Sequence, residues 1–483
     1  MLAVVGVSVA VVDAVTAAPQ TPRVAAPYAR TLPPSVDSPL IGAYYSDWFP
    51  SNSAQGTLRQ HLVPPQGEDP TLVDSADPRV AERAIAQATR SGIDFFALDW
   101  WPSRAAQDEN VDAFLRAKNL PDIKFCMLYE TWDLGFDAGS ESTPVNPAME
   151  AEFDQDLLQF ARHYFTNPSY LRIAGRPVVV LYLTRTLTGD VGGMITGARA
   201  LLEAHGYDPF FIGDEISWRV TSADEATGTL ALTQTPQVSR IDLFDAITAY
   251  SLYSGGPPDP LSPQQDFENY PGETSLVPDE VALYRKYEDA TDGWVPVVPD
   301  VMPGINTRGV RLQVNEHAQP RQWLPGGSSG STLQHYLAQI AAPTLTGDLP
   351  MVFVTSWNEW NEDTAIQPVG GVPTSRDDSA NGTEYTQGYT YGGEGDADLD
   401  AVRDYADVAW GLLTGVTGRP EPHVRVIETE AGRPVNSVLS DSQGWFVLPR
   451  TGSCPARLSV SVPGDTRSFT CSAASASLVD LRS

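Results

Sequence analysis

The sequence predicts an α/β protein in which a (β/α)8 TIM barrel is followed by a small all-β sandwich domain. Short apolar runs rich in β-branched and aromatic residues alternate eight times with helical patterns, which is typical of a parallel sheet that closes into a barrel. Acidic and aromatic residues stand at the carboxyl ends of these runs. After residue 418 the pattern changes to short strands separated by turn residues, which indicates a second domain.

The first 38 residues fit neither domain. Residues 1–18, MLAVVGVSVAVVDAVTAA, form a short apolar run that closes on small residues, as in a secretory signal peptide. The run is too short for a membrane span and is interrupted by Asp13, so membrane insertion is not expected. Residues 19–38 are rich in proline and alanine and are predicted to be a linker. We therefore expect a secreted, extracellular or cell-envelope protein whose barrel covers residues 39–418.

The apolar runs of the barrel follow one another in a regular order. They are Leu40–Trp48, Gly92–Trp101, Lys124–Glu130, Arg176–Leu183, Pro209–Ile216, Phe244–Tyr253, Trp294–Pro303 and Met351–Trp360. Helical patterns such as PRVAERAIAQATRSG and DEVALYRKYEDA lie between them. A doubly wound open sheet is the alternative fold. It requires a phosphate-binding fingerprint after the first strand, and SDWFPSN is not one.

The end of the chain is predicted to be a separate β-structure. The segment Asp396–Gly415 has a helical pattern, and residues 419–483 contain strand patterns with turns at AGRP, DSQG and VPGD. This pattern resembles the transthyretin-like and carboxypeptidase-regulatory-like sandwich modules of secreted enzymes. Cys454 and Cys471 flank one of its strands and are a candidate disulfide in an exported protein. Cys126 lies in an apolar run and is expected to be a core residue.

Charge and composition limit the classes of ligand. The formal net charge is −30, which repels nucleic acid and anionic lipid surfaces but does not disfavour neutral sugars. No cysteine–histidine cluster has zinc spacing and no glycine-rich phosphate loop is present in the sequence, so neither a metal nor another cofactor is expected. We expect a monomer that acts on a glycan.

Candidate binding residues stand where the strands end, which is where a barrel of this kind places its active site. Aromatic rings stack on sugar C–H faces, and carboxylates accept hydrogen bonds from sugar hydroxyls, so this set favours a polyhydroxylated ligand. A single tryptophan at a strand end more often packs in a core, and a single aspartate there often caps the next helix. For Asp47 and Asp300, helix capping is at least as much expected as a role in the site. The predicted substrate-binding residues at these ends are Tyr44, Tyr45, Asp99, Trp100, Trp101, Glu130, Asp214, Glu215, Tyr250, Trp357, Asn358 and Trp360.

Glu359 and Glu362 are the predicted catalytic pair. They leave the eighth run three residues apart, close enough to face one cavity. Glycoside cleavage needs two carboxyl groups, one to protonate the leaving oxygen and one to act as nucleophile or base. Two nearby carboxylates repel each other, which raises one pKa and separates the two roles. The alternative is that Glu362 only caps a loop.

The string SWNEWNEDTAIQP in the eighth run resembles the catalytic signature of glycoside hydrolase family 99 and its bacterial relatives. IGAYYSDWF, SGIDFFALDWW, FDAITAYSLY and PDVMPGINTRGVR agree with the same family in order, and the likeness covers residues 39–409. The resemblance implies a barrel glycosidase that cleaves α-mannosidic bonds within a chain and retains anomeric configuration without a metal.

The resemblance also implies residue roles. Glu359 would deprotonate the sugar 2-hydroxyl, and Glu362 would protonate the leaving group and then activate water. Tyr250 matches a tyrosine near the reacting sugar, and Tyr44 or Tyr45 matches the first-strand aromatic residue. Arg308 or Arg311 matches a seventh-strand arginine, so both join the predicted substrate-binding residues.

The chain departs from the family pattern at several positions. Asn361 replaces a histidine and Asp363 replaces a glycine, while the third run, LYETWDLGF, keeps only Glu130 of its motif. The resemblance implies that these positions line the substrate subsites, so they would affect the identity of the glycan. We therefore expect a secreted, retaining, endo-acting glycoside hydrolase for an α-linked, mannose-containing glycan. The alternatives are a non-catalytic glycan-binding protein and a surface-polysaccharide assembly protein on the same barrel.

Overall fold

The computed structural model covers the 483-residue chain, and every structural statement below refers to its described residues. These are residues 39–49, 62–63, 73–103, 107–137, 140, 142–216, 219–221, 235–250, 253–254, 270–274, 276–305, 319–345, 349–360, 362–368, 370–372, 391–406, 408–414, 424–430, 433–439, 445–449, 457–462, 465–470 and 479–480.

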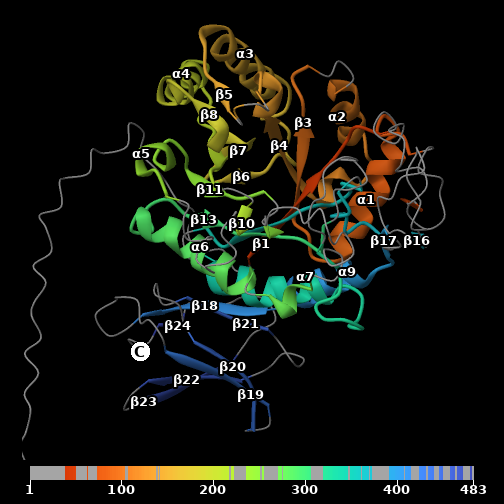
Figure 1. The fold of residues 1–483 in the computed structure, drawn as a ribbon, viewed down its shortest axis with the longest axis vertical. Coiled ribbons are helices and arrows are strands. Elements are labelled where there is room, and N and C mark those ends of the chain that lie inside the picture. The colour runs from red at the N-terminus through yellow and green to blue at the C-terminus, as the bar shows by residue number, and fades with distance from the viewer. Residues whose placement is uncertain are drawn as a thin grey trace, which may run out of the picture. The chain divides into compact units, whose positions relative to one another are not determined.

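Each of the eight predicted runs forms a strand of one parallel sheet (Figure 1). The strands are β1 (Leu40–Tyr45), β3 (Phe95–Trp100), β4 (Lys124–Glu130), β7 (Arg176–Tyr182), β9 (Phe210–Asp214), β11 (Ala246–Thr248), β13 (Val297–Val298) with β14 (Asp300–Val301), and β15 (Met351–Val354). β13 and β14 are two short segments of the seventh run.

The seventh run closes the sheet into a barrel. β13 pairs with β11 through Val297 and Ile247, while β14 pairs with β15 through Val301 and Val354. β1 pairs with β3 on one side and β15 on the other, and all these pairs are parallel. The predicted TIM barrel is confirmed, and the open-sheet alternative is wrong. Because all strands run the same way, their carboxyl ends meet at one end of the barrel.

Helices lie between the strands and outside the sheet (Figure 1). The α-helices are α1 (Pro78–Arg90), α2 (Gln107–Leu115), α3 (Pro147–His163), α4 (Val191–Ala204), α5 (Val238–Ile241), α6 (Leu276–Ala290), α7 (Ser331–Tyr336), α8 (Ala342–Thr344) and α9 (Ala397–Ala406). α1 begins where Asp77 accepts a hydrogen bond from the Arg79 amide and Pro78 takes the first helical position. Its buried face includes Ala84 and Ile85.

Shorter elements occur in the connections. The 3₁₀ helices are η5 (Leu120–Asp122), η6 (Thr131–Leu134), η7 (Thr184–Thr186) and η10 (Pro271–Glu273), and η12 (Leu337–Ala341) is a π-helical turn. The short strands are β2 (Leu62–Val63), β5 (Thr143–Pro144), β6 (Arg172–Ile173), β8 (Leu187–Thr188), β10 (Arg219–Thr221), β12 (Tyr253–Ser254), β16 (Gly370–Val372) and β17 (Tyr391–Glu394).

Large aromatic side chains fill the barrel interior. The Phe95 ring contacts the Phe353 ring edge-on at 5.6 Å, and the Tyr44 ring stacks on Phe353 at 4.8 Å. Gly42 on β1 makes room for Phe95, since a Cβ at Gly42 would lie 2.1 Å from the Phe95 ring. Residues two apart on β1 thus share the interior face, as strand geometry requires.

The C-terminal strands form two sheets. One has the order β21 (Trp445–Pro449), β18 (Val408–Thr414), β24 (Val479–Asp480). The other has the order β20 (Arg433–Leu439), β19 (Arg425–Glu430), β22 (Arg457–Val462), β23 (Asp465–Thr470).

The prediction of one helix over Asp396–Gly415 is wrong for the second half of this segment. α9 ends at Ala406, and β18 pairs with β21 in the register Trp410↔Val447. Val408, Trp410 and Gly411 are weak helix formers, so pairing with β21 outweighs the helical pattern.

The N-terminal segment, the cysteines and membrane insertion were also subjects of prediction. Residues 1–38, Cys454 and Cys471 lie outside the described residues, so the signal peptide, the linker and the disulfide stay predictions. Cys126 is buried in the barrel core, as expected. None of the helices within the described ranges combines the length and the hydropathy needed to span a membrane.

Candidate active site

The residues after β15 form the centre of the candidate site. The Trp357 amide donates to the Tyr44 carbonyl at 2.7 Å, which continues the contact between β15 and β1. The Asn358 side chain donates to the Ser46 carbonyl and accepts from the Ser46 amide, both at 2.7 Å. Asn358, predicted to bind substrate, therefore clamps the ends of two neighbouring strands together.

Glu359 lies on a loop that is held by hydrogen bonds between its own residues. Its amide donates to the Ser356 hydroxyl at 2.8 Å, and its carbonyl accepts from the Thr364 amide at 3.3 Å. The Ser356 and Thr364 hydroxyls lie 3.0 Å apart. These bonds fix the backbone of Glu359, whose side chain is buried, with 4% of the residue exposed.

Arg321 holds the backbone that follows Glu362. Asp363 has a left-handed φ of 56°, and Arg321 donates to its carbonyl at 2.9 Å and its carboxylate at 3.1 Å. Arg321 also donates to Asp398 of α9 at 2.8 Å. A left-handed position favours glycine, asparagine or aspartate. Asp363 thus adopts the left-handed backbone and forms an ion pair with Arg321.

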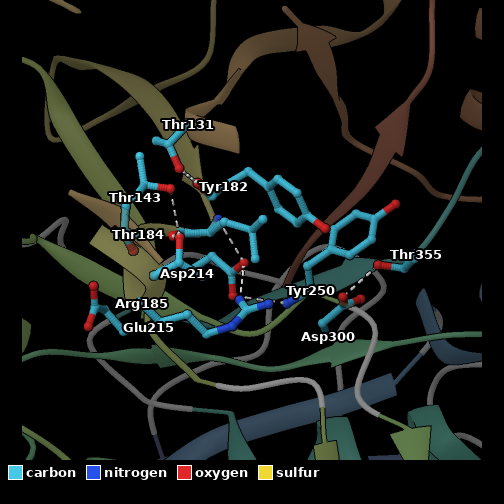
Figure 2. Close-up of polar contacts among 12 residues, drawn as sticks. Thr131, Thr143, Tyr182, Thr184, Arg185, Asp214, Glu215, Tyr250, Asp300 and Thr355 are labelled. Carbon is cyan, nitrogen blue, oxygen red and sulfur yellow. Dashed lines mark hydrogen bonds and ion pairs between the residues drawn. The ribbon is translucent and has the colours of Figure 1, made fainter. Parts of the chain in front are cut away.

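A row of three tyrosine rings lies beside this loop. Tyr44 contacts Tyr250 at 4.9 Å between ring centroids, and Tyr250 contacts Tyr182 at 4.9 Å edge-on. Figure 2 shows the Tyr182 and Tyr250 rings next to each other. At the edge of the same view Thr355 donates to Asp300 at 2.5 Å. Asp300 is therefore engaged in a buried contact between the seventh and eighth strands.

Three of the predicted acidic residues lie close enough to Tyr250 for their charges to act on its hydroxyl. Burial raises the pKa of Tyr250 well above its ordinary value, and the charges of Glu362, Glu359 and Asp99 raise it further, together with Tyr182. These carboxylates come from β3 and from the loop after β15, and all act on one hydroxyl. Tyr250 therefore stays protonated and can donate a hydrogen bond into the site.

Tyr182 extends the same cluster to β4. Burial raises its pKa well above the ordinary value, and the Glu130 carboxylate is the largest charge contribution, opposed by Arg185. Glu362 and Asp214 raise it as well. The charges of Glu130 and Glu362 therefore act on the same phenol group.

Asp214 positions the backbone that follows β7 and β11. It accepts from the Leu183 amide at 3.0 Å and the Tyr250 amide at 3.3 Å, and it forms an ion pair with Arg185 (Figure 2). Burial raises the pKa of Asp214, and Arg185 opposes the rise. With both oxygens engaged by the protein, this predicted substrate-binding residue fixes the backbone of Tyr250.

Glu215 and Tyr45 lie on the opposite face of their strands. Arg240 of α5 donates to both carboxylate oxygens of Glu215, at 2.9 and 3.0 Å. The Tyr45 ring packs against Phe96 and against Phe114 of α2. Adjacent residues in a strand point to opposite faces, so only one of each predicted pair can face the interior. Tyr44 and Asp214 are the inward members.

Asp99 and Trp101 reach the mouth, whereas Trp100 does not. The Trp101 indole donates to the Asp99 carboxylate at 2.9 Å, and its ring lies 5.9 Å from the half-buried Trp48. Trp100 packs against Phe160 of α3 and donates to Asp108 of α2. Trp100 therefore joins the strand to its helices, while Trp48 and Trp101 form an accessible aromatic edge.

The two tryptophans of the eighth run are packing residues. Trp357 is 0% exposed and contacts Phe96, and Trp360 is 2% exposed and contacts Phe49. Neither ring has an exposed face for a sugar, although both were included among the predicted substrate-binding residues. Arg308 and Arg311 lie outside the described residues.

A family model described as Glycosyltransferase WbsX matches residues 40–372, from β1 to β16. The chain belongs to this WbsX family. The predicted catalytic and substrate-binding residues all fall within the matched range.

Relatives of this WbsX-family chain are distant. The protein WxcX of Xanthomonas campestris pv. campestris is 24% identical over 341 residues, which is 68% of this chain and 44% of WxcX. The chain thus spans less than half the length of the curated relatives it matches.

Solved structures that resemble the WbsX-family chain include the following two. A glycoside hydrolase-like protein superposes with a TM-score of 0.53 at 17% identity, over 78% of this chain and 97% of that one. The GH99 endo-alpha-mannosidase from Bacteroides thetaiotaomicron has a TM-score of 0.48 at 16% identity, over 76% and 96%. The first likeness is one of fold alone.

The structure adds residues to the WbsX-family site that were not in the predicted set. Tyr182 ends β7 and could have been included by its position, whereas Arg321 lies in an irregular segment with no pattern to mark it. Trp132 stands two residues after Glu130 in the string LYETWDLGF and is exposed. In the described part of the chain, no group of three or more acidic, histidine or cysteine side chains could hold a metal ion.

Proposed function

We propose that the chain is a glycoside hydrolase that cleaves an α-linked, mannose-containing glycan within its chain and retains the anomeric configuration. The observation that carries the proposal is the position of Glu359 and Glu362 on one short loop, beside Tyr250 at the carboxyl end of a closed parallel barrel. The loop is held at Ser356, Thr364 and Asp363, so the two carboxyl groups are presented by a fixed backbone.

The reaction follows from the two carboxyl groups and the sugar's own 2-hydroxyl. Glu359 removes the 2-hydroxyl proton, the oxygen attacks the anomeric carbon, and the bond to the leaving oxygen breaks as Glu362 protonates that oxygen. An epoxide-like sugar results. Glu362 then removes a proton from water, which opens the ring at the anomeric carbon, while Glu359 returns its proton to the 2-oxygen. Two displacements at one carbon retain its configuration.

The surrounding groups support binding of a neutral sugar. Tyr250 donates a hydrogen bond to the reacting sugar, and Asp99 and Glu130 accept hydrogen bonds from its hydroxyls. A glycan that carried carboxylate or phosphate groups would be repelled by these carboxylates and by the formal net charge of −30. We also propose that the protein is exported, on the ground of residues 1–18, and acts as a monomer.

The test is turnover of wild type, Glu359→Gln and Glu362→Gln on purified α-mannans and other neutral α-glycans. We expect shorter oligosaccharides from an α-mannan with wild type, and a loss of about 10²–10⁴-fold in kcat for each variant. Thermal unfolding should hardly change, because glutamine keeps the shape of a side chain that lies outside the barrel core. Wild-type turnover by either variant on a verified substrate would refute the assigned roles.

The description of the family favours glycosyl transfer as a second candidate function. The same pair would then hand the sugar to an acceptor hydroxyl in place of water. Mass analysis of products formed with an added oligosaccharide acceptor distinguishes the two, because transfer lengthens the acceptor and hydrolysis does not. Binding of a glycan with no product of either kind would identify a non-catalytic binding protein.

A further inference from the structure

An exposed aromatic pair stands at the mouth of the barrel outside the residues assigned to the reaction. Trp132 lies in η6, directly after β4, and is 37% exposed. Its ring stacks on Phe136 with centroids 3.8 Å apart and planes 23° from parallel. Phe136 thus supports one face of the indole.

The turn that carries this pair is fixed by its backbone and its anchors. Gly135 has a left-handed φ of 114°, and the Phe136 amide donates to the Trp132 carbonyl at 3.0 Å, which folds Phe136 back under the indole. The Thr131 hydroxyl donates to the Tyr182 carbonyl at the end of β7 (Figure 2). The aromatic surface is therefore held in place before any ligand binds.

The pair is continuous with the acidic site. Glu130, whose charge acts on Tyr182, is the residue that precedes η6. On the other side, Asp133 accepts from the Ser103 amide at 2.6 Å, which ties η6 to the loop after Trp101. Trp132 therefore belongs to the same strand-end surface as the catalytic pair.

We propose that Trp132, backed by Phe136, is a sugar-binding subsite for a ring of a neutral glycan away from the reacting bond; this rests on the proposed function in taking a glycan as the ligand. A flat indole stacks on the C–H face of a sugar ring, and nearby Asp133 and Glu130 can accept hydroxyl hydrogen bonds. The same carboxylates disfavour an anionic chain. The subsite makes the protein prefer chains long enough to reach from Glu362 to Trp132.

Native affinity electrophoresis of the full chain tests this subsite. The gels contain α-mannan, dextran or pullulan as neutral chains, and dextran sulfate as the anionic chain. We expect retardation of wild type in at least one neutral gel and none in dextran sulfate. In that neutral gel, Trp132→Ala should bind about threefold to tenfold more weakly, and Trp132→Phe should keep most of the affinity.

Trp294→Ala is the matched control. Trp294 is 49% exposed but stands before β13, at the opposite end of the barrel, so its loss should leave the affinity unchanged. The proposal is overturned if Trp132→Ala binds as wild type does, if Trp294→Ala loses as much, or if no neutral gel retards wild type.

The same gels separate this proposal from the catalytic one. Glu362→Gln should be retarded like wild type, and adding Trp132→Ala to it should weaken binding by the same factor. If that effect is seen while no glycan is cleaved, the subsite stands and the hydrolase assignment fails. If glycan is cleaved but the Trp132 substitution changes neither binding nor chain-length preference, the subsite fails alone.

Discussion

At the scale of single residues, the end of β15 explains why a core strand stops in tryptophan, asparagine and glutamate. Trp357 and Trp360 pack behind the mouth of the barrel, and Asn358 ties β15 to β1. Glu359 and Glu362 carry the proposed chemistry. The position of both glutamates on one loop after the eighth strand could be predicted from the sequence, whereas their role in chemistry stays a prediction. The packing role of the tryptophans could not be predicted, because the same residue type at a strand end also serves as a sugar platform.

Asp363 tests how the Glu362 loop is held. Asp363→Ala should lower the free energy of unfolding by about 3–5 kcal/mol, because it leaves the buried Arg321 short of a partner. Asp363→Asn should cost less, since asparagine accepts a hydrogen bond and tolerates a left-handed backbone. Denaturant unfolding measures both.

Asp292 provides the control for this comparison. It is exposed and has a φ of 50°, so Asp292→Ala should cost about 1–2 kcal/mol for the left-handed backbone. Equal losses at the two positions would show that the Arg321 ion pair contributes nothing to the loop.

At the scale of strands and helices, side-chain alternation decides which predicted residues reach the site. Tyr44, Asp99 and Asp214 point inward, so their neighbours Tyr45, Trp100 and Glu215 contact the helices instead. Strand existence could be predicted from the apolar runs. Which residue of each pair faces the interior could not be predicted, since both residues are polar or aromatic. Only the register of the closed barrel decides which side chain points inward.

The contact between β4 and α3 makes stability depend on pH. Tyr129 donates to Asp156 of α3 at 2.7 Å. Burial raises the pKa of Asp156 to about 6, the Tyr129 bond opposes the rise, and the charges of Glu152 and Asp108 add to it. The folded chain thus holds this proton more tightly than the unfolded chain, so stability falls as the pH rises from about 4 through about 6.

Asp156→Asn should remove this loss. Relative to wild type, the variant should gain about 1 kcal/mol in the free energy of unfolding between about pH 4 and pH 7, a small value because the group is partly exposed. Asp404→Asn, on an exposed position of α9, is the control. A difference between Asp156→Asn and wild type that does not change with pH would contradict the explanation.

At the scale of the whole molecule, the barrel could be predicted because eight strand signals repeat in order and each strand pairs with its neighbours in sequence. The C-terminal region was predicted less well. β18 has the pattern of a helix continuing α9, and only its partner β21, some thirty residues later, makes it a strand.

The proposed catalytic and substrate-binding residues precede α9, and Asp398, which supports them through Arg321, lies within it, so the C-terminal strands should not be needed for chemistry. A chain that ends at Asp407 should keep turnover on a small soluble substrate. A chain that ends at Gly395 should lose it, because it lacks Asp398, the partner of Arg321, and the buried Leu399 and Val402. Circular dichroism checks folding in each case. A folded but inactive chain ending at Asp407 would show that the later strands contribute to the site.

The central claim is that Glu359 is the base and Glu362 the acid, and the dependence of rate on the leaving group tests it most directly. The measurement is kcat/KM of wild type, Glu359→Gln and Glu362→Gln on an activated aryl glycoside of the accepted sugar, whose leaving group needs no proton. Glu362→Gln should recover to within about tenfold of wild type, whereas Glu359→Gln should stay about 10²–10⁴-fold lower. Recovery of Glu359→Gln instead, or equal recovery of both, would contradict the assignment.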